Sequence, residues 1–515
     1  MSLQEWEWGQ SPRLASYTLS NVRDLPQAAA IGEARLAEMD VVAHVLPFKA
    51  NNYVVENLID WSRPGADPMF VLTFPQRGML SAANYAEMAA ALETGDKAHI
   101  DETANTIRLR LNPHPAGQME LNVPRLADGT ALHGMQHKYR ETCLFFPSQS
   151  QTCHAYCSFC FRWPQFVGMD GLKFAMRESE QLVQYLREHP EVTDVLFTGG
   201  DPMIMRAGVF ATYVNALLEA RIPTLRTIRI GTKALSYWPY KFLTDADAGE
   251  MLDLFGRVTQ AGVHLAIMAH FNHVTEMRTR ACTEAIARVR ATGAQIRTQS
   301  PLLAHINDDG DMWAAMWTEQ VRRGCIPYYM FVVRDTGAQH YFGVPLVRAH
   351  SIFTRAYSRV SGLARTVRGP SMSATPGKVV VDGTADVGGR RAIALRFLQG
   401  RDPSWVGRPF YAEHDERAAW LDELRPLGGG EFFFEARLRE MREGRSSAPF
   451  AKRAKLANQR SVYGAGIRPA RDGRRGSDGP PARGGRGVYR LLVRRHYGRA
   501  PQDGHARVRH RGGQL

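Results

Sequence analysis

The sequence is poor in cysteine and has no long apolar run. Six cysteines in 515 residues are too few for a disulfide framework, and clustered cysteines in a reducing compartment serve more often as ligands or reactive thiols. No run of about 18 apolar residues is present, which excludes a membrane-spanning helix. The opening residues, MSLQEWEWGQ, are polar and acidic, unlike a signal peptide. We therefore expect a cytoplasmic protein without a membrane partner.

Net charge is absent from most of the chain. The total is +14, but the segment from Lys452 to the end holds 17 Lys or Arg and 3 Asp or Glu, whereas residues 1–451 hold 48 of each. Residues 451–515 are rich in Arg, Gly and Pro and cannot bury a core, so we predict a disordered tail. Arg-Gly segments can bind RNA. A solvated tail without a role would have the same composition, and so would a reading-frame artefact of a GC-rich gene. We do not expect nucleic acid as a partner.

Short apolar runs alternate with amphipathic helical segments after a mostly helical N-terminal region, residues 1–125. Such alternation predicts a parallel sheet, and six units are fewer than the eight of a closed barrel. We expect an α/β fold with an open, partial (β/α)6 barrel over residues 126–345 and a further C-terminal region over 346–450. The predicted strands are 142–148, 192–200, 225–233, 263–271, 295–303 and 327–335.

Unusual polar residues follow these runs at the point where each predicted strand ends. In β/α barrels the active site lies at the carboxyl ends of the strands. The sequence therefore places one site at that rim. Its members are the cysteine-rich stretch, Gly199 to Asp201, Thr232, His270, Gln299 and Arg334.

Three cysteines stand close together in TCHAYCSFCFRW, residues 152–163. Cys153, Cys157 and Cys160 have the spacing C-x3-C-x2-C, and no fourth cysteine follows. A cubane iron–sulfur cluster held by three thiolates keeps one iron free for another ligand. Catalytic zinc also leaves a position open, but its sites usually include a histidine or a paired C-x2-C. Three core cysteines by chance is the remaining reading.

This motif, with Phe159 before its last cysteine, resembles that of the radical S-adenosylmethionine (SAM) enzymes. The resemblance implies that Cys153, Cys157 and Cys160 hold a [4Fe–4S] cluster whose open iron binds SAM. An electron donor such as flavodoxin or ferredoxin would then drive SAM cleavage to a 5′-deoxyadenosyl radical. It also implies a SAM contact for Gly199, Gly200 and Asp201, where glycine lets a backbone approach a ligand.

Longer segments are similar to the lysine 2,3-aminomutase family, over about residues 130–380. They include HKYRETCLFF, TGGDPM, IRIGTK, HFNHVTE and PYYMF, in the same order. The resemblance implies a homo-oligomeric isomerase that uses SAM and pyridoxal 5′-phosphate (PLP). It would move the amino group of a small amino acid from carbon 2 to carbon 3.

The same resemblance suggests roles for single residues. Arg162 would bind the substrate α-carboxylate, for which a planar guanidinium is suited, and Lys378 in SATPGKVVVDG would bind PLP covalently. Thr232, His270 and Gln299 would lie near SAM or PLP. The simpler readings are an arginine paired with a nearby acid, a turn lysine and a structural histidine.

Other positions depart from the family pattern. The two aspartates that contact the distal ammonium in lysine-specific members align with Arg334 and Ser371, and Arg334 would repel that ammonium. An acidic, neutral or differently shaped substrate would suit it better, unless Asp335 takes over by a one-residue shift. Two family arginines near the PLP phosphate align with Lys138 and Thr142, and only Lys138 keeps the charge.

Three hypotheses follow. The first is a SAM- and PLP-dependent aminomutase whose substrate need not be lysine. The second is a PLP-independent radical SAM enzyme on the same scaffold, in which Lys378 would be incidental. The third is a non-catalytic iron–sulfur protein associated with RNA through its tail. For either enzyme we expect the helical region and the chain after Lys378 to cover the barrel mouth, because radicals must be kept from solvent.

Overall fold

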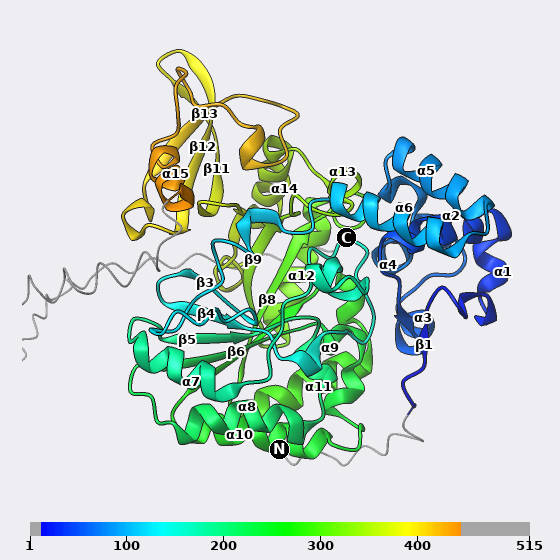
Figure 1. The fold of residues 1–515 in the computed structure, drawn as a ribbon, viewed down its shortest axis with the longest axis horizontal. Coiled ribbons are helices and arrows are strands. Elements are labelled where there is room, and N and C mark those ends of the chain that lie inside the picture. The colour runs from blue at the N-terminus through cyan, green and yellow to red at the C-terminus, as the bar shows by residue number, and fades with distance from the viewer. Residues whose placement is uncertain (1–11, 444–515) are drawn as a thin grey trace, which may run out of the picture. The chain divides into compact units, whose positions relative to one another are not determined.

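The computed structural model describes residues 12–443 and centres on one open sheet of eleven strands (Figure 1). Its strand order is β13-β12-β11-β10-β9-β8-β7-β6-β5-β4-β3, and neighbours from β4 to β10 pair in parallel. The strands are β3 (Met135–Tyr139), β4 (Thr142–Phe145), β5 (Asp194–Phe197), β6 (Thr227–Thr232), β7 (His264–His270), β8 (Gln295–Leu302), β9 (Ile326–Val332), β10 (Arg368–Ser373), β11 (Gly377–Val387), β12 (Arg390–Gly400) and β13 (Pro409–Glu413).

Helices connect the parallel strands, as the alternation predicts. The longer helices bury an apolar stripe at helical spacing, for example Phe210, Val214 and Leu217 of α8. Figure 1 shows α7, α8, α10 and α11 on the outer side of the strands. The connecting helices are α7 (Ser179–Glu188), α8 (Ala207–Glu219), α9 (Ala234–Tyr237), α10 (Ala248–Gln260), α11 (Arg280–Ala291), α12 (Gly310–Arg322), α13 (Gln339–Phe342) and α14 (Leu346–Ser358).

The open (β/α)6 arrangement is confirmed, because each of the six predicted runs overlaps one of the strands β4 to β9. One detail is wrong: Gln299 does not end its strand. It pairs with His270, the last residue of β7, while β8 continues to Leu302 beside β9. The reason is that β9 extends the ladder beyond the end of β7, so Gln299 is level with the rim although it lies inside β8.

The N-terminal region is helical, as predicted, and contacts the cysteine-rich loop. The Lys49 ammonium donates to the Cys153 carbonyl at 2.8 Å, and the Ser158 amide donates to the Leu72 carbonyl at 2.9 Å. This part of the chain therefore braces the loop. Its elements are β1 (Ser16–Tyr17), α1 (Ala28–Ile31), α2 (Glu33–Val45), β2 (Ala50–Asn51), α3 (Asn52–Asn57), α4 (Pro68–Thr73), α5 (Ala82–Glu93) and α6 (Lys97–Arg110).

The C-terminal part extends the sheet beyond the predicted barrel. After α14, strand β10 adds to β9 in parallel, and β11, β12 and β13 follow as antiparallel neighbours. They build a second apolar core around Phe397, Trp405 and Phe410, which α15 (Glu435–Glu443) covers with Leu438. This extension was not predicted from the sequence, yet it places Lys378 at the start of β11.

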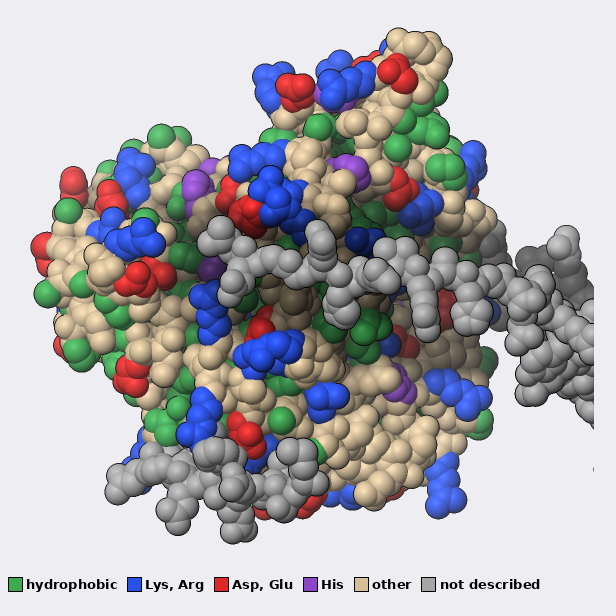
Figure 2. Space-filling view, turned by 180° about the vertical axis from the view of Figure 1, so that it is seen from behind, with side chains coloured by type: hydrophobic (Ala, Val, Ile, Leu, Met, Phe, Trp, Pro, Cys, Tyr) green, Lys and Arg blue, Asp and Glu red, His purple; other side chains and the backbone are tan. Residues whose placement is uncertain are grey.

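Charged side chains of both signs are interspersed on the face shown in Figure 2, in keeping with the balanced charge of residues 1–451. Between residues 12 and 443, no helix is both long and apolar enough to cross a membrane. The predicted disorder of 451–515 concerns residues outside the described range, and the predicted domain boundaries stay predictions.

Candidate active site

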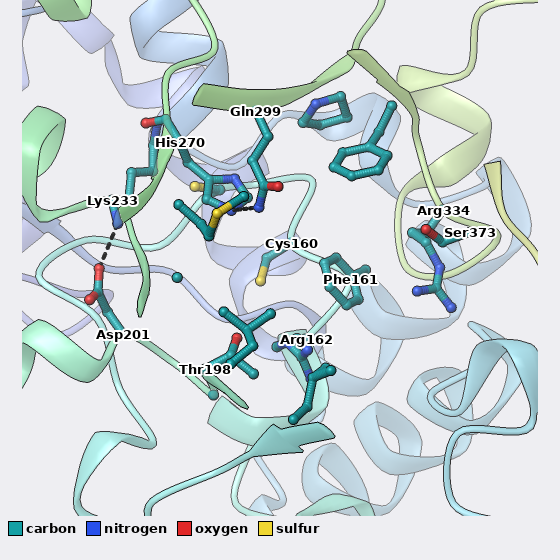
Figure 3. A pocket seen from close by; sticks show the side chains of 18 of the residues that line it. Cys160, Phe161, Arg162, Thr198, Asp201, Lys233, His270, Gln299, Arg334 and Ser373 are labelled. Atoms are coloured by element: carbon teal, nitrogen blue, oxygen red, sulfur yellow. Dashed lines mark hydrogen bonds between the residues drawn. The ribbon is translucent and has the colours of Figure 1, made fainter. Parts of the chain in front are cut away.

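A cavity of about 320 Å³ opens at the carboxyl ends of the parallel strands. Side chains from each of β4 to β9 line it, which means that the sheet wraps around it. The cysteine-rich loop, Lys378 and residues of the N-terminal region and β3 also line it. Figure 3 shows Cys160, Arg162, Asp201, His270, Gln299 and Arg334 around this space. Every site residue predicted from the sequence therefore lines one cavity.

Cys153, Cys157 and Cys160 all line the cavity and remain unpaired by disulfides. Burial raises the pKa of each thiol, to about 12 for Cys160. No three His, Cys, Asp or Glu side chains in the described range converge as ligands of a single metal ion. A cubane cluster does not require such convergence, because each thiolate can bind a different iron. The three thiols thus fit a cluster with one open iron.

Gly199 and Gly200 line the cavity and also lie against the cysteine-rich loop. A Cβ on Gly200 would lie 2.3 Å from the Thr152 carbonyl oxygen and 2.6 Å from that of Ser150, and Gly199 has a φ of +146°. The next amide, that of Asp201, donates to the same Thr152 oxygen at 2.8 Å. Glycine is required at Gly200 because the backbone of the cysteine-rich loop occupies the space of a side chain, and the SAM contact of both glycines stays a prediction.

The Asp201 carboxylate is buried and already receives several protein donors. Its oxygens accept from the Met203 amide at 2.9 Å, the Lys233 amide at 2.8 Å and the Thr232 hydroxyl at 2.7 Å. Burial raises its pKa, while these donors oppose the shift. A carboxylate has about four acceptor sites, so one further donor can be accommodated. Thr232 therefore positions Asp201.

His270 and Gln299 lie side by side on the cavity wall. Their Nε2 atoms are 2.8 Å apart, and burial lowers the pKa of His270 to about 3, so the imidazole is neutral. Next to them Lys233 forms an ion pair with the fully buried Glu276 and donates to Asn272 at 2.9 Å. This buried network was missed by the sequence analysis, because its members come from two separate strand ends.

Arg162 packs among aromatic rings and has no ion pair among the described residues. Its guanidinium carbon lies 4.5 Å from the centroid of Phe146 and 4.9 Å from that of Phe161. Its Nη1 atom is buried without a hydrogen-bond partner. Burial lowers its pKa to about 9. The simpler reading, an arginine paired with a nearby acid, is not what the structure shows.

Lys378 enters the cavity from β11 and faces aromatic rings. Its ammonium lies 4.1 Å from the ring centroid of Tyr329, 5.5 Å from Phe331 and 5.8 Å from Tyr139. Burial, helped by the charge of Arg229, lowers the pKa of Lys378 to about 7. A substantial fraction of this amine is therefore neutral, and hence nucleophilic, near neutral pH.

No family model matches the chain. A curated protein of Aquifex aeolicus, "Putative L-lysine 2,3-aminomutase", is 30% identical over 409 residues, which cover 79% of this chain and 96% of that protein. The chain belongs to the lysine 2,3-aminomutase family. The predicted resemblance to that family is confirmed.

Other members of the lysine 2,3-aminomutase family match a smaller part. L-lysine 2,3-aminomutase of Bacillus subtilis is 28% identical over 45% of this chain and 46% of its own length, and that of Escherichia coli is 28% identical over 46% and 66%. Among solved structures, Streptococcus suis SuiB bound to S-adenosylmethionine aligns with a TM-score of 0.30 and 11% identity over 50% of this chain and 49% of SuiB.

The two positions where the family resemblance places phosphate-binding arginines remain beside positive charge. Lys138 lines the cavity and donates to the Ala374 carbonyl. Thr142 is not basic, but the Arg229 guanidinium donates to its hydroxyl at 3.4 Å. Arg229 is also paired with Asp194 at 2.5 Å. A basic side chain therefore stands at or beside both positions, and the alignment alone did not reveal Arg229, the one beside Thr142.

The two positions that align with the family's distal aspartates are Arg334 and Ser371, and only Arg334 lines the cavity. Arg334 lines the main cavity, whereas Asp335 lines a neighbouring hollow with Asn112 and Asp422. Ser371 is buried in β10, donates to the Met330 carbonyl at 3.4 Å and does not line the cavity. The main cavity therefore contains Arg334 but neither Asp335 nor Ser371.

Proposed function

We propose that the protein is a radical SAM, PLP-dependent amino acid 2,3-aminomutase, an isomerase whose substrate need not be lysine. The observation that carries this proposal is the placement of Lys378. Its amine, with a pKa lowered to about 7, shares one cavity with Arg162 and with three cysteines suited to a cluster. Membership of the lysine 2,3-aminomutase family supports the same reaction.

The residues present fit the three cofactors. Cys153, Cys157 and Cys160 would hold a [4Fe–4S] cluster, which with SAM supplies the radical that takes a substrate hydrogen. Lys378 would hold PLP, which carries the amine as it moves. Tyr139 and Tyr329 offer faces against which an aromatic ring can stack.

The protein's own residues would then have distinct tasks. Lys378 is suited to bond covalently to PLP because its amine is only partly protonated near pH 7. Arg162 would bind the α-carboxylate in two hydrogen bonds, and its packing between Phe146 and Phe161 fixes its direction. The neutral His270, beside Gln299, would contribute a hydrogen bond without adding positive charge.

Parts of the chain outside the barrel meet beside the cavity, which is where shielding of a radical would be needed. The N-terminal helical region braces the cysteine loop, and Arg401 of the C-terminal extension donates to the Ala116 carbonyl at 3.3 Å and to Asn122 at 2.6 Å. Two distant parts of the chain thus meet beside the cavity. Exclusion of solvent protects a reactive intermediate from quenching.

The decisive experiment is to trap the cofactor on the lysine. The protein is purified without oxygen in the presence of PLP, freed of unbound PLP, reduced with borohydride and digested for peptide mass spectrometry. A pyridoxyl group on Lys378, and none on the neighbouring cavity lysines Lys138 and Lys233, is the expected result. The Lys378→Arg variant serves as the matched control and should carry no adduct.

The outcomes separate the alternatives. Protein that cleaves SAM but takes no adduct at Lys378 would contradict the aminomutase and leave a PLP-independent radical SAM enzyme. Protein that binds iron but never cleaves SAM would favour a non-catalytic iron–sulfur protein. A flavodoxin- or ferredoxin-like electron donor, a homo-oligomeric assembly and a cytoplasmic location remain predictions.

A further inference from the structure

The charge of the cavity wall is strongly unbalanced. Its lining contains six basic side chains and one acidic side chain, Asp201. The basic ones are Lys138, Arg162, Arg229, Lys233, Arg334 and Lys378. Arg229 and Lys233 have carboxylate partners outside the lining, in Asp194 and Glu276, and Asp201 receives its own set of protein donors. Burial lowers the pKa of both Lys138 and Lys378. The two remaining guanidinium groups, Arg162 and Arg334, have no carboxylate partner closer than 3.9 Å among the described residues, so an anionic group bound there would balance their charge.

Arg334, like Arg162, has few partners within the protein. Its Nε atom is buried without a hydrogen-bond partner, and its Nη2 atom reaches the Pro115 carbonyl only at 3.5 Å. The nearest carboxylate oxygen, on Asp335, is 3.9 Å from Nε, and that oxygen has no hydrogen-bond partner either. Since a guanidinium has five N–H donors in a planar fork, most of the hydrogen-bonding capacity of Arg334 remains available.

Arg334 and Arg162 both line the cavity and both lie beside Phe161. Their guanidinium carbons lie 5.0 Å and 4.9 Å from the same ring centroid, that of Phe161. The two carbons are therefore no more than about 10 Å apart. Arg162 follows β4 and Arg334 follows β9, so they come from opposite ends of the predicted barrel, and Figure 3 shows both beside Phe161.

We propose that the substrate is an α-amino acid with a carboxylate on its side chain, which Arg334 binds while Arg162 binds the α-carboxylate. This inference rests on the proposed aminomutase function. A compact molecule with two carboxylates matches two guanidinium groups at this spacing, because each pair can form two parallel charge-assisted hydrogen bonds. The ammonium of lysine would instead approach Arg334 as a like charge. Aspartate and glutamate are the amino acids of this class.

The test compares acids with their amides, which have nearly the same shape. Glutamate, glutamine, aspartate, asparagine and lysine are titrated into PLP-loaded protein without SAM or reductant, and binding is followed through PLP absorbance. At least one acid should bind at least about tenfold more tightly than its amide and than lysine. Turnover with SAM and reductant, followed by mass spectrometry, should yield the matching β-amino acid.

Variants at residue 334 test its part directly. Arg334→Gln should lose the tenfold preference for the acid while its affinity for the amide stays unchanged. Arg334→Lys should retain the preference, because it keeps the charge. Asp335→Asn, which alters the neighbouring hollow, should retain it as well.

The two proposals fail in different ways. If Lys378 takes no PLP adduct and no amino acid alters the spectrum, the aminomutase itself is refuted. If PLP binds but the amides or lysine bind as tightly as the acids, the acidic substrate is refuted and the aminomutase stands. The wild-type comparison decides this even if Arg334→Gln does not fold.

Discussion

The two ends of the cavity are built differently. The wall around the cysteines is built largely by loops at the ends of adjacent strands, such as the Asp201 amide on the Thr152 carbonyl and the Asp201 carboxylate on Thr232, with the N-terminal region bracing it from outside. The wall around Lys378 assembles Tyr139, Tyr329 and Arg334 from distant segments. The first wall keeps the family pattern, and the second departs from it at Arg334. Generation of the radical and choice of substrate can therefore vary separately.

The largest effect is expected from removing a cysteine of the first wall. Cys157→Ala should lose the iron–sulfur absorbance and reduce formation of 5′-deoxyadenosine to the uncatalysed level, because a thiolate ligand is lost. Cys282→Ala, at a buried cysteine of α11 outside the cavity, should keep both properties. If both variants behaved alike, the three-cysteine motif would not be what holds the iron–sulfur cluster.

The next test changes only the wall around Lys378. Lys378→Ala should abolish covalent attachment of PLP while the iron–sulfur absorbance remains, since the lysine lies on β11 and not in the cysteine loop. Absorbance spectra of one sample report both cofactors. Simultaneous loss of both would show that the two walls are not independent.

The pH dependence of PLP attachment tests the environment of the wall around Lys378. Only a neutral amine attacks the aldehyde, and burial lowers the pKa of Lys378 to about 7. The initial rate of attachment should therefore fall as pH drops below about 7 and level off above it, as measured by stopped-flow absorbance. A rate that keeps rising toward pH 10 would mean that the lysine has an ordinary pKa.

A smaller effect is expected where the two strand-end loops touch. In Gly200→Ala the new Cβ would overlap the backbone of Ser150 and Thr152, and we expect a loss of about 1–3 kcal/mol in the free energy of unfolding. SAM cleavage should weaken because the cysteine loop must shift. Gly256→Ala is the matched control, since its Cβ would meet only the flexible end of Gln260 at 4.0 Å. That variant should gain about 0.5–1 kcal/mol, and both are measured by urea unfolding.

The smallest effect is expected from removing residues 451–515. If catalysis belongs to the cavity, the truncated protein should form 5′-deoxyadenosine at an unchanged rate. The matched comparison is the full-length chain assayed with and without added RNA. A loss of SAM cleavage on truncation, or a dependence on RNA, would revive the RNA-associated alternative.

The sequence supported some parts of the fold better than others. The strands β4 to β9 were predicted because buried parallel strands are continuous apolar runs. The extension β10 to β13 was missed, because a run such as Gly377 to Val387 resembles any edge strand and nothing local indicates that it adds to a barrel. Gln299 was placed at a strand end, because the length of β8 depends on its partner β9.

By itself the sequence determined the order of strands and helices, the three-cysteine motif and the loss of a distal aspartate at Arg334, since all of these are local properties of the chain. Tertiary structure decided the rest. Burial in the folded protein lowers the pKa of Lys378. The fold also places Asp335 in a different hollow from the cavity that Arg334 lines, and it brings Arg334 beside Phe161 and Arg162. The physical reason is that charge balance and desolvation depend on which distant residues become neighbours.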